Sequence, residues 1–180
     1  MSIKKKIISI TGLFLSFALL ASSCLSSSKT YSGSFSPGPL LELPETVTSL
    51  FPTEENSITL TLNKDNTLTG EYHLSLRLDN HYLEDDQGTL SGNLDPDTQK
   101  IKGVYEAQSK NLQADRESQN TVYGYFYATL KDDQFTGSFS PPLIDKGDLK
   151  TFDKMEEDAK ERGMSIEDIA YYLFTAKLKK

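Results

Sequence analysis

The chain has 180 residues, with 19 basic and 26 acidic side chains and a formal net charge of −7 at pH 7. Without residues 1–23, which hold three lysines and no acid, the net charge becomes −10. This acidic balance argues against nucleic acid or anionic lipid head groups as partners, because both are bound by basic surfaces. The length predicts one domain whose core is stable without disulfides.

The first 24 residues have the layout of a secretory signal peptide. A basic segment, Lys4–Lys6, precedes fourteen uncharged residues, then small residues and Cys24, the only cysteine. The apolar run is shorter than the roughly 20 residues that a membrane-spanning helix needs. An ordinary secreted protein with a chance cysteine is the alternative interpretation.

The segment around Cys24 resembles the lipobox of bacterial lipoproteins, although Ala21 stands where that family usually has Leu. The resemblance implies that Cys24 is lipidated and becomes the new N-terminus. Ser26, in place of Asp, implies sorting to the outer membrane, on its periplasmic or its cell-surface face. Residues 24–30 are then a lipidated tether, and several acyl chains give stable anchoring where one does not.

From residue 31 to 142 the sequence repeats a hairpin pattern and predicts a β-barrel domain. Three units, which begin at Leu62, Leu94 and Leu130, each give Leu-x-x-Asp, a polar turn and a strand with Gly and an aromatic residue. Apolar residues at every second position predict a half-buried antiparallel sheet. The expected strands are about 31–36, 57–63, 67–78, 88–94, 100–107, 121–130 and 134–140, with a possible eighth from the linker 39–56.

The pentapeptide GSFSP occurs at Gly33–Pro37 and again at Gly137–Pro141. The first and last expected strands are therefore equivalent, and pairing them would bury both edges of the meander and close it into a small barrel. An open two-sheet sandwich is the alternative. The glycines fall on the apolar, inward face, where they either let the sheet bend or leave space for a ligand.

Short strands, Gly-aromatic returns and the lipobox together resemble the small calycin-type barrels of bacterial envelope lipoproteins. The stretch YSGSFSPG, followed by ITLTLNKDNTLTGEY, resembles the copper-resistance, envelope-stress lipoprotein family over residues 31–105. The paired cysteines that this family carries near its first strand are absent here. We therefore expect no metal or redox role from this resemblance.

Residues 143–180 predict two α-helices packed on the barrel. The first has an apolar face that includes Phe152 and ends at Gly163. The second starts at Ser165, which forms a capping-box pattern with Asp168. Its apolar stripe is Ile166, Ile169, Ala170, Leu173 and Phe174.

Three tyrosines, Tyr123, Tyr125 and Tyr127, alternate on the outward face of the sixth expected strand. We expect the C-terminal helices to cover them. The alternative is an exposed binding surface, where tyrosine is enriched.

The sequence offers no catalytic constellation and no cofactor motif, so we expect a protein that is not an enzyme. His81, Glu84, Asp85 and Asp86 suggest either a metal site or a solvated acidic turn, and we favour the turn because one imidazole with carboxylates defines a metal shell poorly. Residues 108–120 are expected to form a long polar loop, either a mobile linker or a binding element.

Two functions remain open on these observations. The first is a lipid-anchored envelope protein whose barrel binds a small apolar ligand or an envelope component. Its candidate ligand-binding residues are Tyr72, Tyr105, Phe126 and Phe139. The second is a surface-exposed adhesin or assembly accessory that binds a protein partner through its loops.

Overall fold

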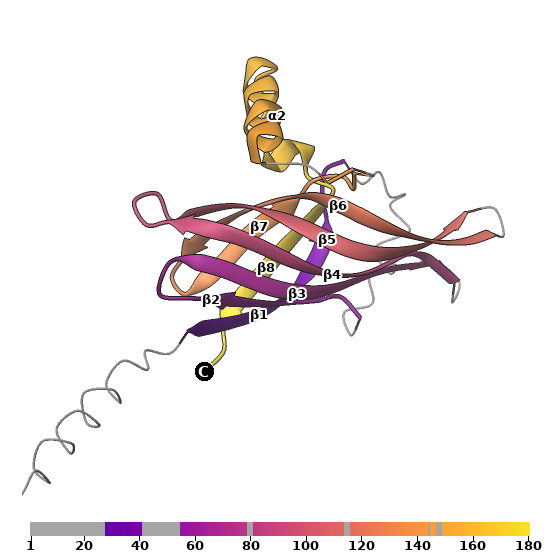
Figure 1. Ribbon diagram of the computed structural model, residues 1–180, viewed down its shortest axis with the longest axis horizontal. Helices are drawn as coiled ribbons and strands as arrows, with labels where there is room; N and C mark the ends of the chain where they lie inside the picture. Colours follow the sequence, from indigo (N-terminus) through magenta and orange to yellow (C-terminus); the bar gives the residue numbers. More distant parts are fainter. Residues whose placement is uncertain (1–27, 41–54, 79–80, 114–115, 144, 147–148) are drawn as a thin grey trace, which may run out of the picture.

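The computed structural model describes residues 28–40, 55–78, 81–113, 116–143, 145–146 and 149–180. The described chain is mainly β, a closed barrel of eight antiparallel strands in which each strand pairs with the next along the chain (Figure 1). The strands are β1 (Lys29–Pro37), β2 (Ser57–Leu62), β3 (Thr67–Leu78), β4 (His81–Asp95), β5 (Lys100–Gln113), β6 (Arg116–Lys131), β7 (Gln134–Phe139) and β8 (Tyr172–Leu178).

The alternation read from the sequence is the alternation of the barrel wall. Leu68, Tyr72 and Leu74 on β3 are buried in the interior, whereas Thr69 and Glu71 between them are exposed. Period two follows from the pleat of a strand, which points successive side chains to opposite faces. The predicted antiparallel barrel is confirmed, and the alternative sandwich is excluded because the strand order closes on itself.

The prediction of two C-terminal helices is wrong in its second half. One helix, α2 (Leu149–Glu161), is present, and Gly163 follows it with a φ of 72°. The Ser165–Asp168 capping box also forms, with Ser165 N–H donating to Asp168 Oδ2 at 2.7 Å. Only a single 3-10 turn, η3 (Glu167–Ile169), follows it before the chain becomes the strand β8.

The strand β8 closes the barrel, because it lies between β1 and β7 and pairs with both. Tyr172, Phe174 and Ala176 point inward and are buried. The GSFSP repeats lie on its two sides: Gly33 pairs with Ala176, and Gly137 pairs with Phe174. The expected direct pairing of the two repeats is therefore wrong, because β8 lies between them.

Helix α2 lies outside the barrel wall and packs against it through Phe152 (Figure 1). The Phe152 ring contacts Tyr125 edge-on, with ring centroids 5.3 Å apart. Lys102 on β5 pairs with Asp153 and Glu156 of the helix. Tyr125 and Tyr127 are consequently buried on the outer face, which agrees with the expected helical cover, whereas Tyr123 is only partly buried and pairs with Leu143.

Several expected loops have a different outcome. Residues 108–113 and 116–120 belong to the long strands β5 and β6, so the predicted polar loop is instead the end of a hairpin. Cys24, the signal segment and most of the linker, 41–54, lie outside the described residues. Strand β1 begins at Lys29, inside the segment interpreted as a tether. Among the described helices, none is both long and apolar enough to cross a membrane.

The inward glycines accommodate aromatic rings from the neighbouring strand. Gly103 pairs with Phe126, and Gly124 pairs with Tyr105. A Cβ added at Gly124 would lie 2.3 Å from the Tyr105 ring, closer than real Cβ contacts allow. The glycine leaves the ring room to lie flat along the sheet, a known use of aromatic residues beside strand glycines. Neither bending nor an empty cavity is needed to explain these positions.

We expect Thr175→Pro to destabilise the barrel by about 2 kcal/mol or more, because it removes a backbone donor from the closing strand. Thr175 is exposed and pairs with Ser34 on one side and Thr136 on the other, so little side-chain packing is lost. Urea unfolding measures the change. Thr175→Val is the matched control and should leave stability nearly unchanged. Equal stability of the Pro variant and the wild type would contradict the pairing of β8 with its neighbours.

We expect Gly124→Ala to destabilise the protein by about 2 kcal/mol through the clash with the Tyr105 ring. Tyr105→Ala should also destabilise it, because a buried ring is lost. The double variant should lose less stability than the sum of the two single losses, because the ring that obstructs the new methyl group is absent. A double-mutant cycle by urea unfolding tests this coupling. Strict additivity would show that Gly124 is required for another reason.

Candidate functional site

The four residues predicted to bind a ligand meet inside the barrel. Tyr72, Tyr105, Phe126 and Phe139 come from four different strands and are all buried. Phe139 lies at their centre, with ring-centroid distances of 5.2 Å to Tyr72, 4.9 Å to Tyr105 and 6.0 Å to Phe126. Edge-to-face and tilted contacts of this kind stabilise an aromatic core beyond the area that they bury. The four side chains therefore form one packed aromatic cluster.

Beside this cluster lie two carboxylates, although the sequence predicted a solvated turn at their positions. Glu84 and Asp86 lie in β4, and they share the inward face with Gly88 and Leu90. Their residues are 9% and 4% exposed, respectively. The prediction of a solvated acidic turn is thus wrong for these positions. The inward parity of Leu94, Gly92, Leu90 and Gly88, continued backward along the chain, could have found both residues.

Hydroxyl groups from β5 and from β8, a strand that does not pair with β4, contact the pair. Tyr172 Oη on β8 donates a hydrogen bond of 2.6 Å to Glu84 Oε2. Asp86 forms hydrogen bonds with Ser109 on β5 and with Glu84. The carboxyls also lie close enough to Tyr72 and Tyr105 to influence their ionisation. We call Glu84, Asp86, Ser109 and Tyr172 the acid pocket; this name describes their chemistry and not an empty volume.

The pair holds one proton at neutral pH. Burial and the neighbouring charge of Glu84 raise the pKa of Asp86 to about 8. Burial also raises the pKa of Glu84, while hydrogen bonds from Tyr172 and Asp86 act in the opposite direction. Protonated Asp86 therefore donates to ionised Glu84. Burial raises the pKa of Tyr72, Tyr105 and Tyr172 as well, so their hydroxyls stay neutral.

The acid pocket is incompletely satisfied. Asp86 Oδ1 is buried and has no hydrogen-bond partner among the described residues. None of the ion pairs between described residues reaches Glu84 or Asp86. A buried acceptor left unpaired costs about 1–3 kcal/mol, and such a group in a folded protein calls for an explanation. The arrangement therefore lowers the stability of the fold. Apolar residues at these positions would serve folding at least as well.

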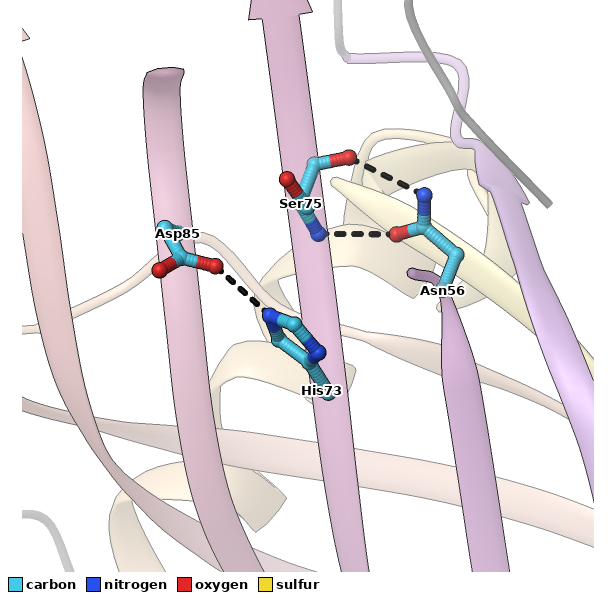
Figure 2. Close-up of polar contacts among 4 residues, drawn as sticks. All are labelled: Asn56, His73, Ser75 and Asp85. Atoms are coloured by element: carbon cyan, nitrogen blue, oxygen red, sulfur yellow. Dashed lines mark hydrogen bonds and ion pairs between the residues drawn. The ribbon is translucent and has the colours of Figure 1, made fainter. Parts of the chain in front are cut away.

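A second polar cluster lies on the outer face of the same strands (Figure 2). His73 Nε2 and Asp85 Oδ1 are 2.6 Å apart. The Asn56 side chain bonds the Ser75 backbone twice, through Nδ2 to the carbonyl at 3.0 Å and through Oδ1 from the N–H at 2.9 Å. Asn56 thereby continues the pairing of β2 with β3 by one more residue, using its amide in place of a backbone.

The outer cluster contains the residue types of a nucleophile, a base and an acid without the connection between them. Ser75 Oγ is buried and has no hydrogen-bond partner among the described residues, so it makes no bond to His73. Figure 2 shows Asp85 on one side of His73 and the Asn56 bonds on the Ser75 backbone. Nucleophilic catalysis requires the nucleophile and the base within hydrogen-bond reach of each other. We therefore assign this cluster to the sheet surface and not to the candidate site.

Comparison with known proteins adds no identification: no family model matches the chain, and no curated protein matches it. The fold is consistent with a calycin-like barrel on the strength of its closed antiparallel meander of eight strands. The candidate site consequently rests on the residues of this chain alone.

We expect Asp86→Asn to make the protein more stable than the wild type at pH 8, with a smaller difference at pH 5. The folded pKa of Asp86, about 8, lies above the ordinary value of 3.8. The folded state therefore keeps a proton that the unfolded state loses, and wild-type stability falls as pH rises between these two values. The gap between the two proteins should grow by on the order of 2 kcal/mol from pH 5 to pH 8.

Urea unfolding at both pH values measures this gap. Asp97→Asn, which removes a carboxylate from an exposed turn, is the matched control. A gap that stays constant from pH 5 to pH 8 would mean that Asp86 is already ionised in the folded protein over this range.

Proposed function

We propose that this protein is a lipid-anchored bacterial envelope lipoprotein, not an enzyme, whose barrel binds a small, mostly apolar ligand or envelope component. One observation carries the proposal: in a closed, aromatic-lined barrel, the buried carboxyl of Asp86 lies beside Tyr72 and Tyr105, and its Oδ1 has no hydrogen-bond partner among the described residues. Ligand sites in proteins commonly combine apolar and aromatic walls with a few polar groups that fix orientation.

The place of the acid pocket in the barrel suits such a role. Tyr172, which bonds Glu84, pairs with Pro37 at the end of β1, whereas β1 begins eight residues earlier at Lys29. Lys29 lies five residues after Cys24, a reach of at most about 18 Å when extended. If Cys24 carries the acyl chains, the barrel end with the start of β1 lies nearest the membrane. The acid pocket then lies toward the end that faces away from it.

The aromatic cluster supplies the apolar part of the site. Burying apolar ligand surface against it contributes about 25 cal/mol per Å². Because these buried rings fill the barrel centre, the ligand binds at the acid pocket and contacts Tyr72 and Tyr105 only after side chains move to admit it. The wall of the barrel is closed, because each of the eight strands pairs with a neighbour on both sides over at least part of its length.

The alternative, an adhesin or assembly accessory, has less support. An exposed tyrosine patch would favour it, but Tyr125 and Tyr127 are only 0% and 7% exposed. Phe152 of α2 occupies the face that a protein partner would have used. The predicted binding loop at 108–120 consists largely of strand residues. We therefore prefer ligand binding inside the barrel.

Native mass spectrometry of the full protein, extracted from the envelope of a bacterium that expresses it, tests this function. We expect an acylated Cys24 and a non-covalent adduct that dissociates on unfolding. Tyr72→Ala and Tyr105→Ala should reduce the adduct, because they remove its aromatic walls. Tyr123→Ala, on the outer face of β6, is the matched control and should retain it. A folded, acylated protein without any adduct, and without affinity for apolar compounds, would refute the proposal.

A further inference from the structure

The acid pocket is surrounded by acids and hydroxyls on every described element that faces it. Asp85 adjoins the pair on β4, and Tyr72 faces it from β3. Tyr105 and Ser109 face it from β5, and Tyr171 and Tyr172 from the C-terminal segment. No described basic side chain forms an ion pair with either carboxyl. Among the described residues, the site therefore has two buried acids and no cation that forms an ion pair with them.

We propose that the ligand is an organic cation, an apolar body carrying a protonated amine, and that its ammonium group binds between Glu84 and Asp86 against Tyr72 and Tyr105. This inference rests on the proposed function, because it names the chemical class of the ligand for the same site. An ammonium group donates hydrogen bonds, so it would satisfy Asp86 Oδ1, the buried acceptor without a described partner.

The tyrosine rings strengthen this choice. A cation near the face of an aromatic ring is attracted by the ring quadrupole, and the attraction grows when water is excluded. Tyr72 and Tyr105 lie 6.0 Å apart, ring centroid to ring centroid, and meet nearly at right angles. An amine with an apolar body can thus place its charge at the carboxyls and its hydrocarbon on the rings. The described residues of the protein provide no such cation at the two carboxyls.

A metal ion fits the same residues less well. No group of three or more His, Cys, Asp or Glu side chains among the described residues is arranged to hold a metal ion. Calcium takes six to eight oxygen ligands, and magnesium demands a near-octahedral set. The pair offers two carboxylates, and Tyr172 Oη already donates to one of them. An ammonium group needs only two or three acceptors, which the pair supplies.

Binding exchanges one cation for another. In the free protein the pair holds one proton, on Asp86, and the incoming ammonium displaces it to solvent. The complex then contains two carboxylates and one ammonium group. One proton, that of Asp86, has been released to solvent. Below about pH 8, where Asp86 is protonated, the affinity for the amine should therefore fall by roughly tenfold per pH unit.

Four compounds with one chain length test the inference against the full acylated protein in nonionic micelles. The probes are decylamine, decyltrimethylammonium, decanol and decanoate, measured by titration calorimetry at pH 6 and pH 8. We expect decylamine to bind at least about tenfold more tightly than decanol at pH 8, and decanoate to bind weakest. Decylamine binding should strengthen from pH 6 to pH 8, while decanol binding stays constant.

Substitutions locate the effect. Glu84→Gln and Asp86→Asn should each weaken decylamine binding by about tenfold or more and leave decanol binding nearly unchanged. Glu106→Gln, which removes an outward-facing carboxylate of β5, is the matched control and should change neither. Asp86→Asn is expected to be at least as stable as the wild type, so a loss of amine binding in this variant is not a loss of fold. Urea unfolding of each variant checks this point.

The outcomes separate the two proposals. If decanol and decanoate bind as tightly as decylamine, or if neither carboxyl variant weakens the amine, the cation inference is wrong and the apolar binding function stands. If decylamine binds and decyltrimethylammonium does not, the inference stands, and hydrogen-bond donation by the ammonium group is required in addition to its charge. If no decyl compound binds to the folded protein, the cation inference fails together with the proposed function.

Discussion

The closure of the sheet by β8 is the constraint on which the rest of the structure depends. Strands β1 and β7 each have one edge that no earlier strand pairs, and β8 pairs with both. The same strand supplies inward Tyr172, which bonds Glu84, and Phe174, which packs on Phe139 with ring centroids 5.7 Å apart. One segment of seven residues therefore satisfies two sheet edges, completes the aromatic core and positions a donor at the acid pocket.

Most of the barrel was predictable because its signal is local. A strand with one apolar face has apolar residues at every second position, and Leu68, Tyr72, Leu74 and Leu76 on β3 keep this spacing. Strand β8 was not predictable, because Ile166, Ile169, Leu173 and Phe174 fit a helical spacing while Tyr172, Phe174 and Ala176 fit a strand. The local capping box between Ser165 and Asp168 does form. The helix nonetheless fails to propagate, because pairing with two open edges outweighs the propensity of a short segment.

The candidate site likewise contains residues that the sequence predicted and residues that it missed. Tyr72, Tyr105, Phe126 and Phe139 were found because inward aromatic residues belong to the alternating pattern that defines the barrel. Glu84 and Asp86 were missed because three consecutive acids usually indicate a solvated turn. Only the length of the hairpin decides the matter: β3 and β4 stay paired up to Leu78 and His81, which carries the acids into the wall. A single sequence contains no direct signal for where a polar hairpin ends.

A barrel with this much aromatic packing can tolerate a costly polar group at one end. Phe35, Tyr72, Tyr105 and Phe174 all contact Phe139 or one another, so the centre is stabilised by many shared contacts. The pairing of glycine with aromatic rings across strands gives these large side chains room inside a small barrel. The acids then stand where packed rings give way to hydroxyls. The aromatic packing in one half of the barrel thus offsets the cost of burying two carboxyls in the other half, which folding alone does not require.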